Sequence, residues 1–333
     1  MSEWFFTSDL HGQGELYEQV VALAAAHRPS AVLIGGDLGP HATGAPGVRH
    51  QRVFLEGFFV EFARRLREAS PGVELALLMG NDDWAANLDV LEHHHGSLWH
   101  ALHGRAVTLH GHAVAGSSYV PITPFTIKDW ERWEDGGDET PPRPTGWRSN
   151  EHGVQDFTFD AADRSPTIAE ALAELASLTP AEDTIHVLHS PARDCACDCI
   201  AAGVHVGSRA IRAFVESRQP PLVLSGHIHE SPRVSGAWRD TIGRTTVVNA
   251  GQFGTPRLSG VRFDPARPGF ASARLWVIDS APATIVPETL HLPHTIEPPK
   301  GGSVCRVVTF PPDAAWAGKV GAKEVGAYFS AMG

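Results

Sequence analysis

The chain has 333 residues, of which 42% are hydrophobic and 8% aromatic, so it can bury a substantial core in one or two domains. Its formal net charge of −11, counted with the 19 histidines neutral, argues against indiscriminate binding of nucleic-acid polymers or anionic membranes. No apolar run approaches the roughly 20 residues needed to cross a bilayer, so we expect no membrane-spanning segment. A phosphate substrate remains compatible with the acidic composition, because a bound metal ion can reverse the local field.

The start of the chain and its cysteines indicate a cytoplasmic protein. Residues 1–6 lack a basic segment followed by a long apolar one, so we expect no signal peptide. Three of the four cysteines, Cys195, Cys197 and Cys199, are too close together for an ordinary disulfide framework, and Cys305 is distant in sequence. We expect free thiols in a reducing cytoplasm, with a third metal site or a redox switch as the alternative.

The first third of the chain alternates short apolar strands with amphipathic helices. The apolar runs predict strands at residues 4–7, 31–34 and 74–79. Helical periodicity predicts helices at residues 15–27, 53–66 and about 85–94. Near-continuous apolar strands separated by helices indicate a buried sheet that is largely parallel or mixed.

The remainder of the chain is less regular. Residues 106–115 predict one strand, and residues 119–165, rich in Pro and Trp, predict a long irregular insertion that is either a lid or disordered. Helices are predicted at residues 168–178 and 208–216, and strands at residues 184–188, 222–224, 246–249, 273–278 and 283–286. We therefore expect one domain over residues 1–297, containing that insertion, and a weakly patterned C-terminal extension over residues 298–333.

Polar clusters follow five of the predicted strands. They hold two Asp, one Asn and four His, namely Asp9, His11, Asp37, Asn81, His189, His227 and His229. Ligand sites of open α/β sheets lie outside the carboxyl ends of the strands, so these side chains are expected to converge.

This donor set predicts a metal site. Oxygen and imidazole ligands without thiolate suit manganese, iron, zinc or nickel. Each cluster alone is a weak signal, since His227 and His229 by themselves would be read more simply as surface or capping residues. The ordered set of five clusters, each flanked by Gly or Pro, is much more specific.

The order Asp-x-His, Gly-Asp, Gly-Asn, His, Gly-His-x-His resembles the signature of the calcineurin-like metallophosphoesterase superfamily, over about residues 5–230. Residues 116–125, 205–209 and 226–231 resemble a microbial branch of it. The resemblance implies a four-layer α/β/β/α sandwich of two mixed sheets flanked by helices. It also implies that Asp9, His11 and His229 hold one metal ion, that Asn81, His189 and His227 hold a second, and that Asp37 bridges the two.

The function implied by this resemblance is the hydrolysis of a small phosphate ester, with phosphodiesters favoured. Two metal ions about 3.5–4 Å apart can clamp a phosphoryl group and activate a bridging hydroxide for in-line attack. Asp37 and Asn81 would then act at the reacting centre. Two rival hypotheses are a non-catalytic interaction scaffold on the same fold and a phosphoprotein phosphatase.

One position departs from the superfamily pattern, in which the third strand is followed by Gly-Asn-His. Here the sequence is Gly80-Asn81-Asp82-Asp83. Asp82, when ionised, cannot protonate a leaving group, and two nearby metal ions would lower its pKa further. Poor leaving groups should then react slowly unless another acid serves, and His205 is the candidate; the alternative is an ordinary loop histidine.

The insertion at residues 119–165 is the second open question. Trp130 and Trp133, with Lys128 and Arg132, could close over a substrate by stacking and phosphate binding. Alternatively, the insertion packs its own Trp side chains against the core. The functional hypothesis is a lid or wall beside the metals that helps to select the substrate.

Overall fold

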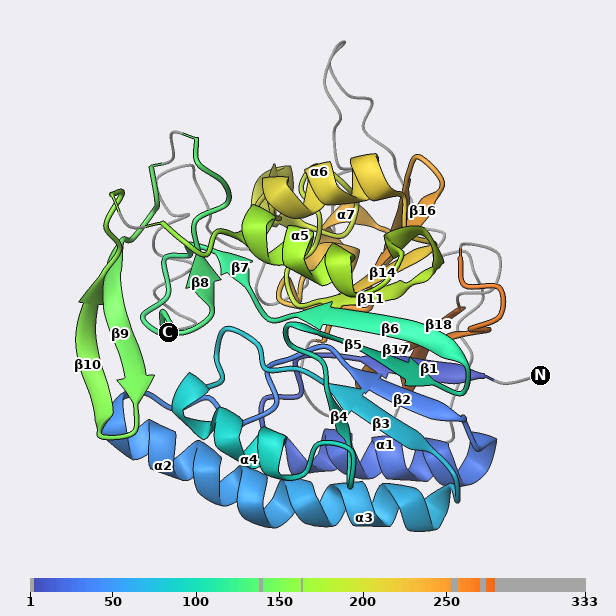
Figure 1. The fold of residues 1–333 in the computed structure, drawn as a ribbon. Coiled ribbons are helices and arrows are strands. Elements are labelled where there is room, and N and C mark those ends of the chain that lie inside the picture. Colours follow the sequence, from blue (N-terminus) through green and yellow to red (C-terminus); the bar gives the residue numbers. More distant parts are fainter. Residues whose placement is uncertain (1–2, 138–139, 163, 253–256, 270–273, 279–333) are drawn as a thin grey trace, which may run out of the picture.

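The computed structural model describes residues 3–137, 140–162, 164–252, 257–269 and 274–278 (Figure 1). The strand expected at residues 283–286 and the extension expected at residues 298–333 lie outside the described residues. Within the described part, no helix is both long and apolar enough to span a membrane.

The first sheet has six strands in the order β18-β17-β1-β2-β3-β4. The strands from β1 to β4 run parallel to one another, whereas β17 and β18 are antiparallel, so the sheet is mixed. Its strands are β1 (Trp4–Thr7), β2 (Ala31–Ile34), β3 (Glu74–Leu77), β4 (His100–Ala101), β17 (Leu258–Phe263) and β18 (Arg274–Ile278).

The second sheet also has six strands, in the order β15-β16-β14-β11-β6-β5. Its four central strands are parallel, and β15 and β5 pair antiparallel at the two edges. Its strands are β5 (Arg105–Leu109), β6 (His112–Ser117), β11 (Ile185–Leu188), β14 (Leu222–Ser225), β15 (Arg239–Ile242) and β16 (Thr245–Asn249).

Helices cover the outer face of each sheet, which confirms the four-layer α/β/β/α sandwich (Figure 1). The helices beside the first sheet are α1 (Gly14–His27), α2 (Gly44–Phe54), α3 (Val60–Ala69) and α4 (Leu88–His93), with a π-helical segment (Leu55–Phe59) joining α2 to α3. Those beside the second sheet are α5 (Ile168–Leu178), α6 (Arg209–Arg218) and α7 (Ser231–Ser235). The helix expected at residues 53–66 is therefore part of a longer one.

The alternation of side chains along β1 illustrates how the layers are built. Trp4 and Phe6 are fully buried between the two sheets, whereas Phe5 joins the core under the helices. Successive side chains of a strand point to opposite faces, so an apolar residue at every position indicates a strand that is covered on both sides. In β1 the only polar residue is Thr7 at its carboxyl end, and the polar residues Ser8 and Asp9 follow it.

The strand expected over residues 106–115 is instead a hairpin of β5 and β6. Its two-residue turn consists of His110, with φ of 45°, and Gly111, with φ of 85°. Two consecutive residues with positive φ form the turn whose twist matches that of a hairpin. The prediction was wrong because it ran a single strand through His110-Gly111-His112, three residues without an apolar side chain that interrupt the pattern and hold the turn.

The composition of the insertion predicted an irregular segment. In the structure, the insertion contains two small sheets. The parallel pair β7 (Val120–Pro121) and β8 (Glu131–Arg132) lies next to the second sheet, and the hairpin of β9 (Thr145–Asn150) and β10 (Gly153–Thr158) lies against α2 (Figure 1). A third small sheet pairs β12 (Cys199–Ile200) with β13 (Val204–His205).

A fully buried ion pair holds the start of the insertion. Lys128 Nζ donates to Glu131 Oε2 at 2.7 Å and to the Thr123 carbonyl at 2.8 Å, and Thr123 Oγ1 donates to the other Glu131 oxygen. Both charged side chains have no solvent exposure. Burial lowers the pKa of Lys128 and raises that of Glu131 to about 7, while each charge opposes the shift of its partner.

We predict that Lys128→Met destabilises the protein by roughly 3–5 kcal/mol, because Glu131 is then left as a buried, unpaired carboxylate. The double variant Lys128→Met/Glu131→Leu should recover much of this loss, since it removes both charges. Urea unfolding monitored by Trp fluorescence measures the difference. Arg65→Ala, which removes an exposed ion pair with Glu18, is the control and should change the free energy of unfolding less. Equal losses in the single and double variants would contradict this account.

Candidate metal centre

All seven predicted ligands lie in loops that follow the carboxyl ends of parallel strands. The loops after β1, β2 and β3 carry Asp9, His11, Asp37 and Asn81, and the loops after β11 and β14 carry His189, His227 and His229. The two sheets face one another, so their strand ends meet at one edge of the sandwich.

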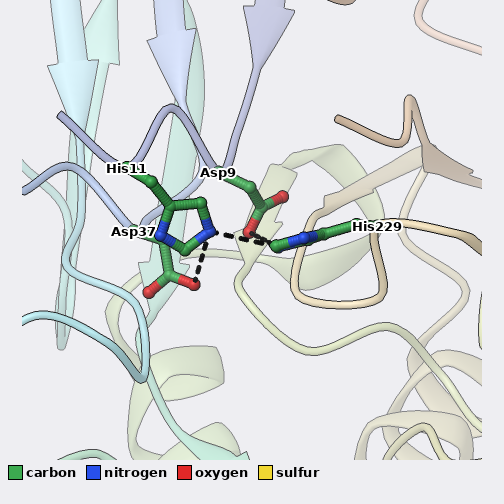
Figure 2. A group of neighbouring side chains, drawn as sticks. All are labelled: Asp9, His11, Asp37 and His229. Carbon is green, nitrogen blue, oxygen red and sulfur yellow. Dashed lines mark hydrogen bonds and ion pairs between the residues drawn. The ribbon is translucent and has the colours of Figure 1, made fainter. Parts of the chain in front are cut away.

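The first group of side chains is Asp9, His11, Asp37 and His229 (Figure 2). One ligand atom from each lies within 4.8 Å of all the others. The Nε2 atoms of His11 and His229 are 3.2 Å apart, and His229 Nε2 is 3.5 Å from Asp9 Oδ1. Two imidazole nitrogens and two carboxylates that converge in this way are suited to hold a divalent ion.

The second group is Asn81, His189 and His227. Asn81 Oδ1 lies 3.0 Å from His189 Nε2 and 2.6 Å from His227 Nδ1. Asp37 connects the two groups, because its Oδ2 atom is 3.8 Å from His11 Nε2 and 3.5 Å from His189 Nε2. The same carboxylate oxygen therefore faces both groups, as a bridging ligand would.

Hydrogen bonds behind the ligands fix their orientation. His189 Nδ1 donates to the Gly35 carbonyl at 2.8 Å in the tautomer that leaves Nε2 as the ligand atom. The side-chain amide nitrogen of Asn81 donates to Asp82 Oδ1 at 3.1 Å, which turns the Asn81 side-chain oxygen toward the two histidines. Asp37 Oδ1 accepts from the Asp82 amide at 2.8 Å, which leaves Oδ2 to face the ligands.

The backbone at the site is held in an uncommon conformation. Four of the seven residues have positive φ, namely Asp9 at 60°, His11 at 44°, Asp37 at 51° and His227 at 66°. Residues other than Gly rarely occupy this left-handed region, and they remain there only where the surroundings enforce it. Such a concentration of strained positions is typical of a functional site.

Two glycines allow the loops to approach closely. A Cβ atom on Gly80 would lie 2.1 Å from Asp37 Oδ1 and 2.5 Å from the His189 ring. A Cβ atom on Gly226 would lie 2.4 Å from Asp9 Oδ2. The Gly residues that precede Asn81 and His227 are therefore required by the space that the carboxylates occupy.

The electrostatics of the cluster couple its carboxylates to its histidines. Burial alone would raise the pKa of Asp37, but the charge and hydrogen bond of His189 hold it well below its ordinary value. Burial opposes a charge on His189 and His229, yet Asp37 and Asp9 respectively raise the pKa of each to about 9. A divalent ion supplies the same compensation to the carboxylates, and it must displace these protons when it binds.

The ligands open into a cavity of about 840 Å³. Its lining includes the insertion segment from Pro121 to Ile127, together with Ile200, Val204 and Val206. Arg193 and Arg209 also line the cavity. Its volume falls within the range of small-molecule sites, and its walls are largely apolar away from the ligands.

The tryptophans Trp130 and Trp133 of the insertion do not line this cavity. Trp130 is buried, donates to the Asp83 carbonyl at 2.7 Å and packs against His103. Trp133 is buried against Phe159, and Lys128 is sealed in its ion pair. The suggestion that Trp130, Trp133 and Lys128 close over a substrate is therefore wrong. The insertion instead presents its segment of Pro, Ile, Thr and Phe side chains to the cavity.

The structure does not bring His205 to the site. Its Nδ1 atom lies 2.6 Å from Asp198 Oδ1, and only its neighbours Val204 and Val206 line the cavity. His205 is thus not positioned to protonate a leaving group there. Of the nearby cysteines, Cys195 and Cys197 are buried free thiols, whereas Cys199 is disulfide-bonded, contrary to the expectation of three free thiols.

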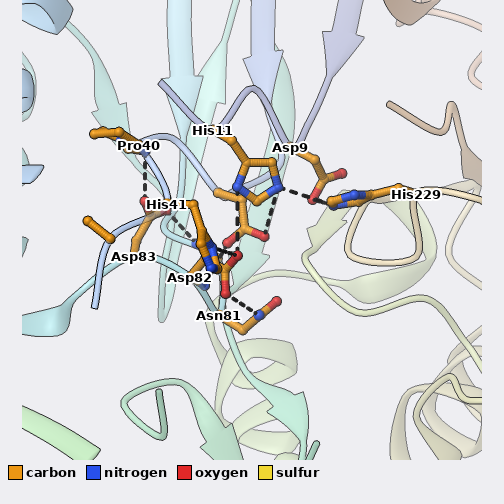
Figure 3. A network of polar contacts seen from close by, with 12 residues as sticks. Asp9, His11, Pro40, His41, Asn81, Asp82, Asp83 and His229 are labelled. Atoms are coloured by element: carbon orange, nitrogen blue, oxygen red, sulfur yellow. Dashed lines mark hydrogen bonds and ion pairs between the residues drawn. The ribbon is translucent and has the colours of Figure 1, made fainter. Parts of the chain in front are cut away.

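One residue of the site was missed by the sequence analysis. His41 lines the cavity, and its Nδ1 atom lies 2.9 Å from Asp82 Oδ2 (Figure 3). It stands four residues after Asp37 in the loop at the carboxyl end of β2. That position was the available signal, because side chains in such loops are the ones that face a ligand.

The four-layer sandwich, with its predicted metal ligands at one edge of the two sheets, is the architecture of a metal-binding phosphoesterase. The chain belongs to the calcineurin-like phosphoesterase family, whose sequence model matches residues 5–231. This family depends on a dinuclear metal centre. No curated protein matches the chain.

Two of the solved structures compared share the fold at low sequence identity. One superposes with a TM-score of 0.56 at 14% identity, over 83% of this chain and 98% of its own. The protein TT1561 of Thermus thermophilus superposes with a TM-score of 0.50 at 20% identity, over 84% of this chain and 98% of its own. An archaeal phosphodiesterase gives a TM-score of 0.40 at 10% identity, over 83% and 99% of the two chains.

We predict that Gly80→Ala prevents stable binding of metal. The new methyl group would overlap Asp37 Oδ1, and the Asp37 backbone nitrogen, 2.5 Å away, leaves little room to shift. Gly136→Ala is the matched control, because no atom lies within 4 Å of the Cβ position there. Elemental analysis of the purified variants measures bound metal, and circular dichroism checks folding. A folded Gly80→Ala protein with the full metal content of the wild type would contradict the close packing described here.

Proposed function

We propose that the protein is a hydrolase of phosphate esters, preferably phosphodiesters, that works with two divalent metal ions. The observation that carries this proposal is the position of Asp37, whose Oδ2 atom faces both His11 and His189 within 3.8 Å. A shared carboxylate between two ligand groups is what a pair of ions needs to stay at a fixed separation.

In this proposal Asp9, His11 and His229 hold one ion, Asn81, His189 and His227 hold the other, and Asp37 binds both. When bound, two ions a few ångströms apart supply Lewis-acid stabilisation of the phosphoryl group and of the attacking oxygen. Manganese, iron, zinc and nickel all suit the donor set. The protein's own contribution is to hold the ligands rigidly and to position the ester in the cavity.

Charge explains why an acidic chain would bind a phosphate here. Two divalent ions carry four positive charges, against two negative charges on Asp9 and Asp37, so the site is positive when it is loaded. Asp82 adds a negative charge at the cavity surface. A monoester carries close to two negative charges near neutral pH and a diester only one, so Asp82 disfavours monoesters more strongly.

The apolar walls of the cavity favour a substrate that is more than a phosphate group. Pro121, Ile122 and Phe125 of the insertion, together with Val204 and Val206, offer contacts to a carbon-rich arm. A diester has two arms, so one can leave while the other lies against this wall. We propose that the insertion acts as this wall and contributes to the choice of substrate.

A panel of esters and metals tests the proposal. Metal-free protein would be loaded with Mn²⁺, Fe²⁺, Zn²⁺ or Ni²⁺ and assayed with bis(p-nitrophenyl) phosphate, p-nitrophenyl phosphate and a phosphopeptide. We expect the diester to be hydrolysed fastest, and chelation to abolish the reaction. Faster hydrolysis of the phosphopeptide would favour a phosphoprotein phosphatase. Absence of hydrolysis by fully metal-loaded protein would favour a scaffold.

We predict that Asp37→Ala lowers kcat for bis(p-nitrophenyl) phosphate by about tenfold or more relative to Asn81→Ala at saturating metal. Asp37 contacts both ligand groups, whereas Asn81 is a neutral ligand to one of them. The comparison is made at increasing metal concentration until both rates level off. Equal residual rates for the two variants would show that Asp37 does not bridge.

We predict that Phe125→Ala raises KM for benzyl p-nitrophenyl phosphate by about three- to tenfold, because part of an apolar contact is lost. The methyl p-nitrophenyl ester should be much less affected, since it makes few contacts beyond the metals. Val53→Ala, at an apolar residue on α2 that is 64% exposed, serves as the control. Equal changes in KM for the two esters would argue against a wall that selects the substrate.

A further inference from the structure

The side chain of Asp82 acts as a hydrogen-bond acceptor at the edge of the metal centre. Its Oδ1 atom accepts from the Asn81 amide at 3.1 Å, and its Oδ2 atom lies 2.9 Å from His41 Nδ1 (Figure 3). Each of its two oxygens thus faces a nitrogen that can donate a hydrogen bond. The partner His41 is therefore the group of this pair that is placed to offer a proton.

His41 is placed where a substrate would lie. It lines the same cavity as Asp82 and the ligand Asn81, and its side chain is 43% exposed. With Nδ1 donating to Asp82, the second ring nitrogen, Nε2, remains as the site from which a proton can be transferred. No hydrogen bond to Nε2 occurs within the described part of the chain.

The loop that carries His41 is held against the loop of Asp82 by a buried amide. The Gln51 side chain, which is 1% exposed, donates from Nε2 to the Pro40 carbonyl at 3.1 Å and to the Asp82 carbonyl at 2.7 Å. Its Oε1 atom accepts from the Trp84 amide at 2.8 Å. Gln51 thus joins the backbone next to His41 to the backbone of Asp82. These hydrogen bonds hold the two loops at a fixed separation, so His41 and Asp82 stay in contact.

The charges around His41 favour its protonated form. The hydrogen bond that His41 donates to Asp82 raises the pKa of His41, burial opposes the shift, and the charges of Asp82 and Asp37 add to it. The other titratable group facing the pair is His11, whose Nδ1 atom is 3.7 Å from Asp82 Oδ2. An imidazolium near the cavity is suited to meet a developing oxyanion.

We propose that His41, positioned by Asp82, is the catalytic acid that protonates the leaving group of the phosphate ester. The inference rests on the hydrolase function proposed above. As a water oxygen forms its bond to phosphorus, the bond from phosphorus to the ester oxygen breaks and that oxygen keeps the electron pair. His41 Nε2 transfers its proton to this oxygen, so an alcohol leaves and a neutral imidazole remains. The attacking water loses a proton to solvent, and His41 regains one from solvent before the next turnover.

The experiment compares two diesters of one alcohol, methyl p-nitrophenyl phosphate and methyl phenyl phosphate. Nitrophenolate departs without protonation, whereas phenolate, with a pKa of about 10, benefits from an acid. We expect His41→Gln to lower kcat/KM for the phenyl ester by about 10²–10⁴-fold and that for the nitrophenyl ester by less than about tenfold. Asp82→Asn should show the same selectivity in weaker form. His152→Gln, at an exposed histidine of the hairpin, is the control and should change neither rate.

Equal losses on the two esters would overturn the proposal, because His41 would then bind or orient the substrate rather than protonate it. Unchanged rates on both esters would overturn it as well. Glu230 also lines the cavity, so the same selectivity in Glu230→Gln, and not in His41→Gln, would assign the acid to that residue. If wild-type protein with full metal content hydrolyses neither ester, the proposed function fails, and this inference fails with it.

A readout independent of activity separates a structural role from a chemical one. Nitrogen-15 spectra of histidine-labelled protein report the protonation of His41 directly. We expect the pKa of His41 to lie above its ordinary value in the wild type and to fall in Asp82→Asn, since the hydrogen bond that His41 donates to Asp82 is the main cause of the shift. Bound metal, measured in the same samples, should remain at the wild-type level in His41→Gln. Loss of metal in that variant would show that His41 supports the ligands instead.

Discussion

The geometry of the site depends on one buried carboxylate, Asp37, that faces both groups of predicted ligands. Asp37 is 1% exposed, and burial of its charge is costly unless positive charge or hydrogen-bond donors compensate it. The backbone amide of Asp82 donates to one oxygen of Asp37, and one histidine from each sheet approaches the other oxygen. That arrangement requires the loops of two sheets to meet within a few ångströms, which explains the left-handed φ of Asp37 and the lack of a side chain at Gly80.

A second buried carboxylate, Asp83, extends this constraint to the insertion. Its oxygens accept from the backbone amides of Leu38, Gly39 and Gly80, so it joins the loops after β2 and β3 from behind. Burial, with the charge of Asp37, raises its pKa to about 7. The Asp83 carbonyl in turn accepts from Trp130 of the insertion. The cavity wall is thereby attached to the same loops that carry the ligands, so the distance between wall and ligands is set by hydrogen bonds rather than by a flexible linker.

The sequence predicted what depends on local pattern. Apolar runs located the central strands, and the polar residues after them predicted seven side chains that the structure brings together, because parallel strand ends must meet. Helix α5 begins where its capping box, Thr167 with Glu170, places it. The pattern failed where contacts are distant in sequence. Nothing in the spacing of Lys128 and Glu131 distinguishes a buried pair from a solvated one, and Trp130 gave no sign that it packs inward. The orientation of His41 at the cavity depends on its contact with Asp82, which is 41 residues away in the sequence.

Asp82 departs from the family pattern, which has a histidine at this position, and its neighbours in the fold change what that departure means. Considered alone, an aspartate in place of the usual histidine removes an imidazole from the metal centre and suggests an impaired site. Within the fold, that aspartate faces a histidine from the neighbouring loop at 2.9 Å, and Gln51 hydrogen-bonds to the backbone beside both. An imidazole therefore lies at the cavity beside Asp82, carried on the loop after β2 and not on the loop after β3. A proton donor must place its nitrogen at the leaving group, and a histidine on the loop after β2 can do so as well as one on the loop after β3, because the two loops are hydrogen-bonded to one another.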